Sequence, residues 1–260
     1  MKFENIRVFL FDLDGVLSVG KENPRYLGGR EVVEKIKSSG RKVAVLTNDS
    51  THTRREIHHN LLSLEFKFDY DEILTSSYLT ATYLTQRFGK ARFFLVGEEG
   101  LRRELEAVDH IATEKDPDVV VVGIDRQLTY NKLDRALQLL RNGAVLIGSY
   151  GGAVYMSDHG PALSAGPIIK ALEYGADKGA VMIGKPSPRM FRLALQRIHE
   201  QPKKAVMVGD QLETDILGAH RAGVHSILVL SGVENRETIA HSDTKPDLVI
   251  EAVDDLMDSL

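Results

Sequence analysis

Side chains that could take part in metal, acid–base or anion chemistry follow four separate apolar runs of the sequence. They are Asp12 and Asp14 after the first run, Thr47 and Asn48 after the second, Lys185 after the third, and Asp210 and Asp215 after the fourth. Two carboxylates as close as Asp12 and Asp14 repel each other unless a cation lies near them. Mg²⁺ prefers such oxygen ligands, and it needs only one or two carboxylates together with a substrate phosphate. A phosphate dianion among carboxylates also needs compensating positive charge, which Mg²⁺ and Lys185 would supply.

Each of these residues also has an ordinary structural interpretation when it is taken alone. An Asp-x-Asp-Gly segment is often only a turn, a threonine at a strand end usually bonds to its own backbone, and a lysine is usually on the surface. Asp210 and Asp215 could cap the helix that follows them. All four runs nevertheless end in residues of the same chemistry, and this joint pattern favours a site over four coincidences.

The apolar runs are typical of parallel β-strands, because most of them are continuous rather than alternating. The predicted strands are Ile6–Phe11, Lys42–Leu46, Arg92–Val96, Val119–Ile124, Ala144–Ile147, Ala180–Ile183, Ala205–Val208, Ile227–Leu230 and Leu248–Ile250. Amphipathic helices are predicted between them at Arg30–Ser39, Arg54–Leu64, Leu101–Val108, Lys132–Arg141, Met190–His199 and Asp215–Ala222. This alternation predicts an α/β fold with a mainly parallel sheet. In such a sheet ligands bind beyond the carboxyl ends of the strands, where the residues above would meet.

The composition excludes several classes of protein. The 260 residues carry 33 Lys+Arg against 37 Asp+Glu, so we expect neither nucleic acid nor an anionic membrane as the main partner. The absence of cysteine removes disulfides, zinc–thiolate sites and thiol nucleophiles. The apolar runs are far shorter than the roughly 20 residues of a membrane span. The first run stops at Asp12 and is no signal peptide, so we expect a cytoplasmic protein.

The four segments resemble the four motifs of the haloacid dehalogenase-like (HAD) phosphatase superfamily, in the same order. Asp12-Leu13-Asp14-Gly15-Val16 is similar to the first motif, Thr47-Asn48 to the second, Lys185 to the third, and Gly209-Asp210-Gln211-Leu212-Glu213-Thr214-Asp215 to the fourth. The sequence is most similar to the NagD-like or p-nitrophenylphosphatase-like subfamily, through segments 122–126, 129–130, 184–188 and 246–247. The resemblance implies a Rossmann-like, doubly wound parallel sheet with an inserted α/β cap domain.

The resemblance also implies catalytic and metal-binding roles. Asp12 would be the nucleophile that takes the phosphoryl group as an aspartyl-phosphate. Asp14 would be the general acid toward the leaving alcohol and then the general base toward water. Asp12, the main-chain carbonyl of Asp14 and Asp210 would hold Mg²⁺ as the cofactor.

The remaining motif residues would act on the substrate phosphate. The resemblance implies that Thr47, the backbone amide of Asn48 and Lys185 bind the phosphate group. Asp215 would support either the metal-bound waters or Lys185.

The resemblance further implies how the chain divides into domains. The HAD core domain would comprise residues 1–78 and 180–260, and the cap domain would comprise residues 79–179, which contain three predicted strands. Capped members tend to act on small metabolites, because a lid excludes water and macromolecules from the site. A small-molecule phosphate ester is therefore the expected partner, and a homodimer is a further expectation from the family.

Three details depart from the family pattern or extend it. Segments 148–152 (GSYGG) and 162–166 (ALSAG) differ from the usual cap motifs, so the substrate preference of a relative does not transfer to this chain. Tyr155 and His159, which lie between these segments, are candidates for contact with the leaving group. Asp49 stands where a second Asn is common; it could place negative charge near the phosphate, but we favour the start of the next helix, where an acid is stabilising.

The sequence therefore predicts a Mg²⁺-dependent phosphatase that acts on small phosphomonoesters. A phosphotransferase of the same superfamily, which passes the group to another alcohol, remains an alternative. So does a receiver-like module that accepts a phosphoryl group without turnover, although receivers are single domains about half this length. A dehalogenase fits less well because its chemistry needs neither Asp14 nor a metal, and an inactive binding protein would be expected to lose Asp12 or Asp14.

Overall fold

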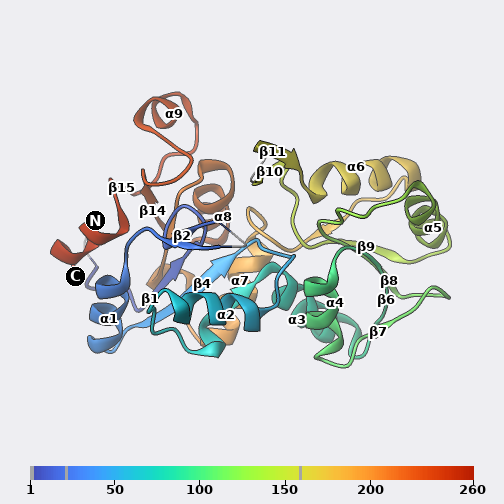
Figure 1. Ribbon diagram of the computed structural model, residues 1–260, viewed down its shortest axis with the longest axis horizontal. Helices are drawn as coiled ribbons and strands as arrows, with labels where there is room; N and C mark the ends of the chain where they lie inside the picture. The colour runs from blue at the N-terminus through green and yellow to red at the C-terminus, as the bar shows by residue number, and fades with distance from the viewer. Residues whose placement is uncertain (1–2, 21–22, 158–159) are drawn as a thin grey trace. The chain divides into compact units, whose positions relative to one another are not determined.

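A computed structural model describes residues 3–20, 23–157 and 160–260 of the chain. The chain forms two compact units (Figure 1). Unit 1 comprises Met1–Thr47, Arg54–Leu74 and Lys185–Leu260, and unit 2 comprises Asn48–Thr53 and Thr75–Gly184. The segment predicted as a cap, residues 79–179, falls inside unit 2. Among the described residues, no helix is both long and apolar enough to cross a membrane.

Unit 1 contains a six-stranded sheet in the order β15-β14-β13-β1-β4-β5. Its strands are β1 (Val8–Phe11), β4 (Lys42–Thr47), β5 (Ile73–Thr75), β13 (Ala205–Gly209), β14 (His225–Val229) and β15 (Leu248–Ile250). β1 pairs in parallel with both β4 and β13, and the pairs β13–β14 and β14–β15 are also parallel. The predicted α/β fold with a parallel sheet is therefore confirmed.

Both faces of this sheet are covered, which explains the continuous apolar runs. All four side chains of β1 are buried. Phe9 and Phe11 share one core with Ile36 and Ile57, from the helices that follow β1 and β4. Leu228 points to the opposite face and packs with the residues that precede α8.

The other elements of unit 1 connect these strands. Its helices are α1 (Arg30–Ser38), α2 (Arg54–Ser63), α7 (Pro188–Ile198), α8 (Leu217–Ala222) and α9 (Arg236–His241), and a small hairpin pairs β2 (Ser18–Val19) with β3 (Arg25–Tyr26). Short helical turns lie at Tyr70–Glu72, Pro202–Lys204, Leu212–Ile216 and Val253–Asp258. The helices predicted in this part of the chain are confirmed within two residues at most of their ends.

The strand order of unit 1 reverses between β1 and β13. From β1 the chain proceeds to β4 and β5 on one side, whereas β13, β14 and β15 lie on the other side. An open parallel sheet has a crevice at such a switch point, beyond the carboxyl ends of the two central strands. Asp12 and Asp210 directly follow β1 and β13, so they lie where this fold favours a ligand site.

Unit 2 has its own parallel sheet, in the order β12-β9-β8-β6-β7. Its strands are β6 (Arg92–Val96), β7 (Ile111–Ala112), β8 (Val119–Val122), β9 (Val145–Gly148) and β12 (Val181–Met182), with a separate antiparallel hairpin of β10 (Val154–Ser157) and β11 (Gly160–Leu163). The helices are α3 (Ser76–Phe88), α4 (Glu99–Glu106), α5 (Tyr130–Arg141) and α6 (Ala165–Ala176). α5 and α6 pack one core against β6, β8 and β9, while α3 packs against α4.

β12 corrects one sequence-based expectation. The strand predicted at Ala180–Ile183 exists, but β12 pairs in parallel with β9 and belongs to the sheet of unit 2. It was expected in the core with the site-bearing strands. Lys185 therefore does not follow a strand of that sheet; it is the first residue after the chain has left unit 2.

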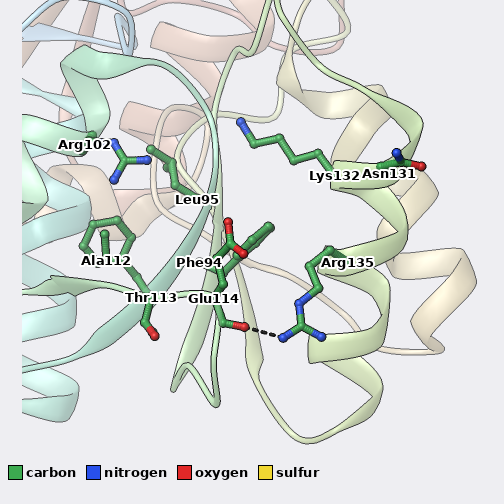
Figure 2. A pocket seen from close by; sticks show the side chains of 10 residues that line it. Phe94, Leu95, Arg102, Ala112, Thr113, Glu114, Asn131, Lys132 and Arg135 are labelled. Carbon is green, nitrogen blue, oxygen red and sulfur yellow. Dashed lines mark hydrogen bonds between the residues drawn. The ribbon is translucent and has the colours of Figure 1, made fainter.

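Unit 2 also contains a pocket of about 570 Å³ beside β6 (Figure 2). Arg102 of α4 and Lys132 and Arg135 of α5 are among the residues that line it. The guanidinium of Arg135 donates a hydrogen bond to the carbonyl oxygen of Glu114. None of the predicted site residues lines this pocket.

Candidate active site

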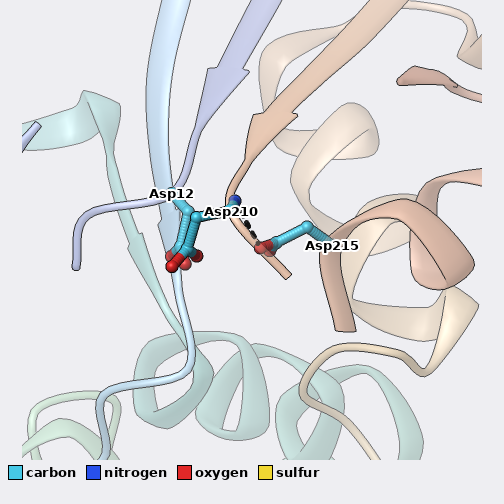
Figure 3. A group of neighbouring side chains, drawn as sticks. All are labelled: Asp12, Asp210 and Asp215. Atoms are coloured by element: carbon cyan, nitrogen blue, oxygen red, sulfur yellow. Dashed lines mark hydrogen bonds between the residues drawn. The ribbon is translucent and has the colours of Figure 1, made fainter. Parts of the chain in front are cut away.

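Asp12 and Asp210 lie side by side at the ends of β1 and β13 (Figure 3). The two strands are in register, with Phe11 beside Val208. The N–H of Asp12 donates to the carbonyl oxygen of Val208 at 2.9 Å, so the pairing continues one residue beyond β1. The first polar residue after each strand is thereby brought to the same place, and both carboxylates are buried.

Lys185 supplies the positive charge of this cluster. Its Nζ lies 2.7 Å from Oδ1 of Asp12 and 2.6 Å from Oδ1 of Asp215, and its side chain is only 1% exposed. The following helix fixes the segment, because the side chain of Ser187 caps α7 and Pro188 begins it. Burial alone would lower the pKa of Lys185, but the two carboxylates outweigh burial and raise that pKa, so the amine is charged.

Asp215 is held from both sides. It lies in one turn of π-helix, Leu212–Ile216, which leads into α8. Its Oδ2 accepts the backbone N–H groups of Asp210 and Gln211, each at 3.2 Å, and its Oδ1 pairs with Lys185. Since both oxygens are engaged, Asp215 is suited to holding Lys185 and the Asp210 backbone rather than a ligand.

Asp210 has one oxygen that is bonded and one that is not. Oδ2 accepts the N–H of Val233 at 3.0 Å. Oδ1 is buried and has no hydrogen-bond partner among the residues that the structure describes. Burial first, and then the charges of Asp215 and Asp12, raise the pKa of Asp210 to about 8. A cation near this carboxylate would favour its ionised form.

The cluster as a whole has the properties of a site for a divalent cation. Oxygen atoms of Asp12, Asp210 and Asp215 lie within 4.8 Å of one another. Burial, against the opposing charge of Lys185, also raises the pKa of Asp215, to about 6. If all three carboxylates are ionised, they carry more negative charge than the single ammonium of Lys185 balances, and hard cations such as Mg²⁺ take carboxylate oxygens as ligands. The residues present therefore fit a divalent metal.

Two further predicted residues lie in the same unit. Thr47 is the last residue of β4, the strand next to β1, and it is buried. Asp14 lies in the tight turn after β1, which is closed by a hydrogen bond from the N–H of Gly15 to the carbonyl oxygen of Ser18 at 2.8 Å. Asp14 is half-buried there. Their roles toward a substrate stay predictions.

The next two residues of the second motif belong to unit 2. The side chain of Asn48 lies against Gly184, where an added Cβ would come within 2.6 Å of its Oδ1. Asp49 is engaged locally, since its Oδ1 accepts the N–H of Thr51 at 2.7 Å and that of His52 at 3.2 Å. α2 begins only at Arg54, so Asp49 closes a turn before the helix and does not lie in its first turn, contrary to the sequence-based expectation. Binding of phosphate by Asn48 stays a prediction.

The two residues considered for contact with the leaving group have different outcomes. Tyr155 is partly buried against the core of unit 2. His159 lies outside the described residues.

Sequence reasoning missed one loop of this site, Ser231–Glu234, which follows β14. Val233 of this loop bonds to Asp210, and the hydroxyl of Ser231 donates to the carbonyl oxygen of Gly15 at 2.8 Å. The strand at Ile227–Leu230 was predicted, so the search at strand ends could have found this loop. The loop gave no signal because its first three residues carry no acid or base.

Comparisons with known proteins identify the class to which this fold and site belong. The sequence model of the family described as haloacid dehalogenase-like hydrolase matches residues 9–111, and a second HAD-hydrolase-like model matches residues 182–256. The 5′-nucleotidase YutF of Bacillus subtilis is 30% identical over 94% of this chain and 95% of its own length. The chain belongs to the haloacid dehalogenase-like hydrolase family.

Solved structures narrow this membership to a subfamily. The p-nitrophenyl phosphatase from Archaeoglobus fulgidus superimposes with a TM-score of 0.93 at 31% identity, covering 98% of this chain and 99% of its own. NagD from Escherichia coli K-12 superimposes with a TM-score of 0.86 at 28% identity, covering 97% and 98%. The predicted membership of the NagD-like, p-nitrophenylphosphatase-like subfamily and the HAD core fold are confirmed.

Proposed function

We propose that this chain is a Mg²⁺-dependent phosphatase that hydrolyses small-molecule phosphomonoesters through an aspartyl-phosphate on Asp12. The enzyme class, phosphoric monoester hydrolase, is that of its named relatives. One observation carries the mechanistic part: the Asp12 carboxylate lies at the switch point of the sheet, 2.7 Å from the Lys185 ammonium and beside a second carboxylate with an unsatisfied oxygen.

In the first half of the reaction, a carboxylate oxygen of Asp12 attacks phosphorus and the bond from phosphorus to the ester oxygen breaks. Asp14 gives its proton to the departing alkoxide, which leaves as an alcohol. The ammonium of Lys185 lies 2.7 Å from Oδ1 of Asp12, so positive charge stands beside the attacking carboxylate.

In the second half, Asp14 takes a proton from water, and the resulting hydroxide attacks the phosphorus of the aspartyl-phosphate. The bond between phosphorus and Asp12 breaks, which restores the carboxylate and releases inorganic phosphate. Asp14 ends the cycle protonated, as it began, so atoms and protons balance.

Charge compensation completes the proposal. Asp12, the main-chain carbonyl of Asp14 and Asp210 would hold Mg²⁺, which neutralises charge on the transferring phosphoryl group when it is bound. Thr47, the N–H of Asn48 and Lys185 would bind the phosphate oxygens.

We further propose that unit 2 is the cap domain and that the substrate is a small phosphate ester. The support is that unit 2 interrupts unit 1 in the sequence and has its own sheet and core. A lid of this kind excludes water and large substrates. The presence of this second unit, together with relatives named as phosphatases, also disfavours the single-domain receiver alternative.

The test is turnover of p-nitrophenyl phosphate with Mg²⁺ and with EDTA, for the unaltered chain and Asp12→Asn. We expect Mg²⁺-dependent turnover that falls by at least about a thousandfold in Asp12→Asn, because a nucleophile cannot be replaced by its neighbours. In Asp14→Asn, acid quench and mass spectrometry should detect a phosphorylated protein, since the second proton transfer is slowed. Near-normal turnover by Asp12→Asn, with an unchanged circular dichroism spectrum, would end the proposal.

A further inference from the structure

The loop Ser231–Glu234 follows β14 and contacts two parts of the candidate site, the first motif and the fourth motif. It is attached to the first motif because Ser231 Oγ donates to the carbonyl oxygen of Gly15 at 2.8 Å. It is attached to the fourth motif because Val233 N–H donates to Asp210 Oδ2 at 3.0 Å. The loop is itself largely exposed, yet Asp210 beneath it is 1% exposed.

A third bond joins the far end of the loop to the same segment. Glu234 accepts the N–H of Leu212 through its Oε1 at 3.2 Å. Leu212 begins the π-helical turn that carries Asp215. The loop therefore contacts the side chain of Asp210, the backbone of Leu212 after it, and the turn after β1.

Two glycines, Gly15 and Gly232, leave room for the Asp210 carboxylate. A Cβ on Gly232 would lie 2.1 Å from Asp210 Oδ2, and a Cβ on Gly15 would lie 2.2 Å from the same oxygen. Such distances are far inside van der Waals contact, so any larger residue at either position would displace the carboxylate. Gly15 also has φ of 83°, which only glycine adopts easily, whereas Gly232 is needed for space alone.

We propose that the Ser231–Glu234 loop is the positioning element of the metal site, and that it orients Asp210 so that only Oδ1 is presented to the cation. This inference rests on the proposed function. The N–H of Val233 engages Oδ2, Gly232 prevents the carboxylate from being pushed aside, and Ser231 keeps the Asp12–Gly15 turn at a fixed distance. Groups that hydrogen-bond to a metal-binding side chain orient that side chain. Removal of one such group typically weakens metal binding by about 10- to 100-fold.

The experiment uses Mn²⁺ as the probe, because free Mn²⁺ gives an electron paramagnetic resonance signal that bound Mn²⁺ loses. Gly232→Ala should raise the Kd for Mn²⁺ by at least about tenfold. Gly179→Ala is the matched control, since its added Cβ meets nothing within 4 Å, and its Kd should equal that of the unaltered chain.

Ser231 provides a second and milder test that does not depend on a steric clash. Ser231→Ala should weaken Mn²⁺ binding severalfold, whereas Ser231→Thr, which keeps the hydroxyl, should restore it. Ser63→Ala is the matched control, because Ser63 also donates to a backbone carbonyl, that of Asn60, at 2.7 Å on an exposed surface. At saturating Mg²⁺ the KM for p-nitrophenyl phosphate should be unchanged in Ser231→Ala, since the loop acts on the metal and not on the ester.

The outcomes separate this inference from the proposed function. Mn²⁺ affinity in Gly232→Ala and Ser231→Ala equal to that of their controls would overturn the positioning role, while the phosphatase proposal would stand. An unaltered chain that neither binds Mn²⁺ nor shows Mg²⁺-dependent turnover would overturn the proposed function, and the inference with it.

Discussion

Replacement of Lys185 by methionine should damage both stability and activity, and the structure allows each effect to be sized. Nζ of Lys185 is buried and pairs with Asp12 at 2.7 Å and Asp215 at 2.6 Å. Methionine keeps the length of the side chain but leaves these carboxylates without their cation. Breaking a buried ion pair in this way costs about 3–5 kcal/mol, a large fraction of the roughly 5–15 kcal/mol that stabilises a typical domain.

The stability loss should depend on the metal, because a bound divalent cation replaces part of the missing positive charge. We expect the full loss in EDTA and a smaller one in saturating Mg²⁺, measured as the free energy of unfolding in urea. Turnover of p-nitrophenyl phosphate should fall by about 10²–10³-fold even with Mg²⁺, as expected for removal of a group that stabilises transition-state charge. Lys203→Met, at an exposed position, is the control and should change stability by less than about 0.5 kcal/mol.

A second variant distinguishes charge from packing. Asp215→Asn added to Lys185→Met removes one of the uncompensated carboxylates, while the asparagine oxygen can still accept the N–H groups of Asp210 and Gln211. The double variant should be more stable than Lys185→Met, and its stability should exceed that expected from the sum of the effects of Lys185→Met and of Asp215→Asn alone by a coupling energy of about 0.5–3 kcal/mol, without recovering activity. A double variant no more stable than the single one would refute the charge argument, and recovered turnover would refute the role of Lys185 in phosphate binding.

Two predictions concern unit 2, away from the proposed chemistry. Burial raises the pKa of Glu98, but hydrogen bonds from Arg126 at 2.7–2.9 Å outweigh burial and hold that pKa below its ordinary value. Ionised Glu98 therefore stabilises the fold at any pH above the pKa of Glu98 in the unfolded chain. This stabilisation is lost as the pH falls through the lower pKa of Glu98 in the folded protein. Glu98→Gln should cost about 1 kcal/mol at pH 7 and less in urea unfolding at about pH 3.5, and an equal cost at both values would contradict this. Buried His110 accepts a hydrogen bond from the N–H of Ala91 at 3.1 Å. His110→Leu should therefore lower the free energy of unfolding by about 1–3 kcal/mol, while kcat of the folded protein stays unchanged. A variant with unchanged stability and a lower kcat would assign His110 a catalytic role instead.

The sequence was sufficient to predict the two central carboxylates because burial on both faces leaves a distinct pattern. A strand covered by helices on each side needs apolar residues throughout, so its first polar residue marks its end. β1 and β13 follow this rule, and Asp12 and Asp210 were found by it. Which strands are neighbours is also partly predictable, since short connections and right-handed crossovers restrict the possible orders.

Lys185 shows what the same rule does not provide. The run before it has the composition of the other strands, but its partner in the structure is β9 of unit 2. Strand pairing depends on residues far away in the sequence, and a two-residue strand carries too few side chains to specify its partner. The structure brings Lys185 into ion pairs with Asp12 and Asp215, which give it a position that no strand end provides, and its role toward a substrate stays a prediction.

Helix α3 was missed for a different physical reason. Its sequence is rich in serine, threonine and tyrosine, which favour strands or caps in isolation and give no clear polar face. In the structure the hydroxyls of Thr80, Thr82 and Thr85 donate to carbonyl oxygens one turn earlier, at 2.7–3.1 Å. These three hydroxyls are satisfied within the helix itself, so Thr80 can be fully buried, and a pattern based on hydrophobicity alone does not detect this.

The three carboxylates of the site are positioned by backbone groups that themselves have no acid–base chemistry. Asp12, Asp210 and Asp215 would repel one another if nothing held them, and their positions are set by groups with no acid–base chemistry. These groups are the N–H of Val233 on Asp210, the N–H groups of Asp210 and Gln211 on Asp215, and the backbone pairing of Asp12 with β13. The strand ends therefore determine which residues meet, whereas the loops behind them determine which oxygen each residue presents. For this reason the loss of a glycine in an exposed loop should change metal affinity, while the same substitution at Gly179 should not.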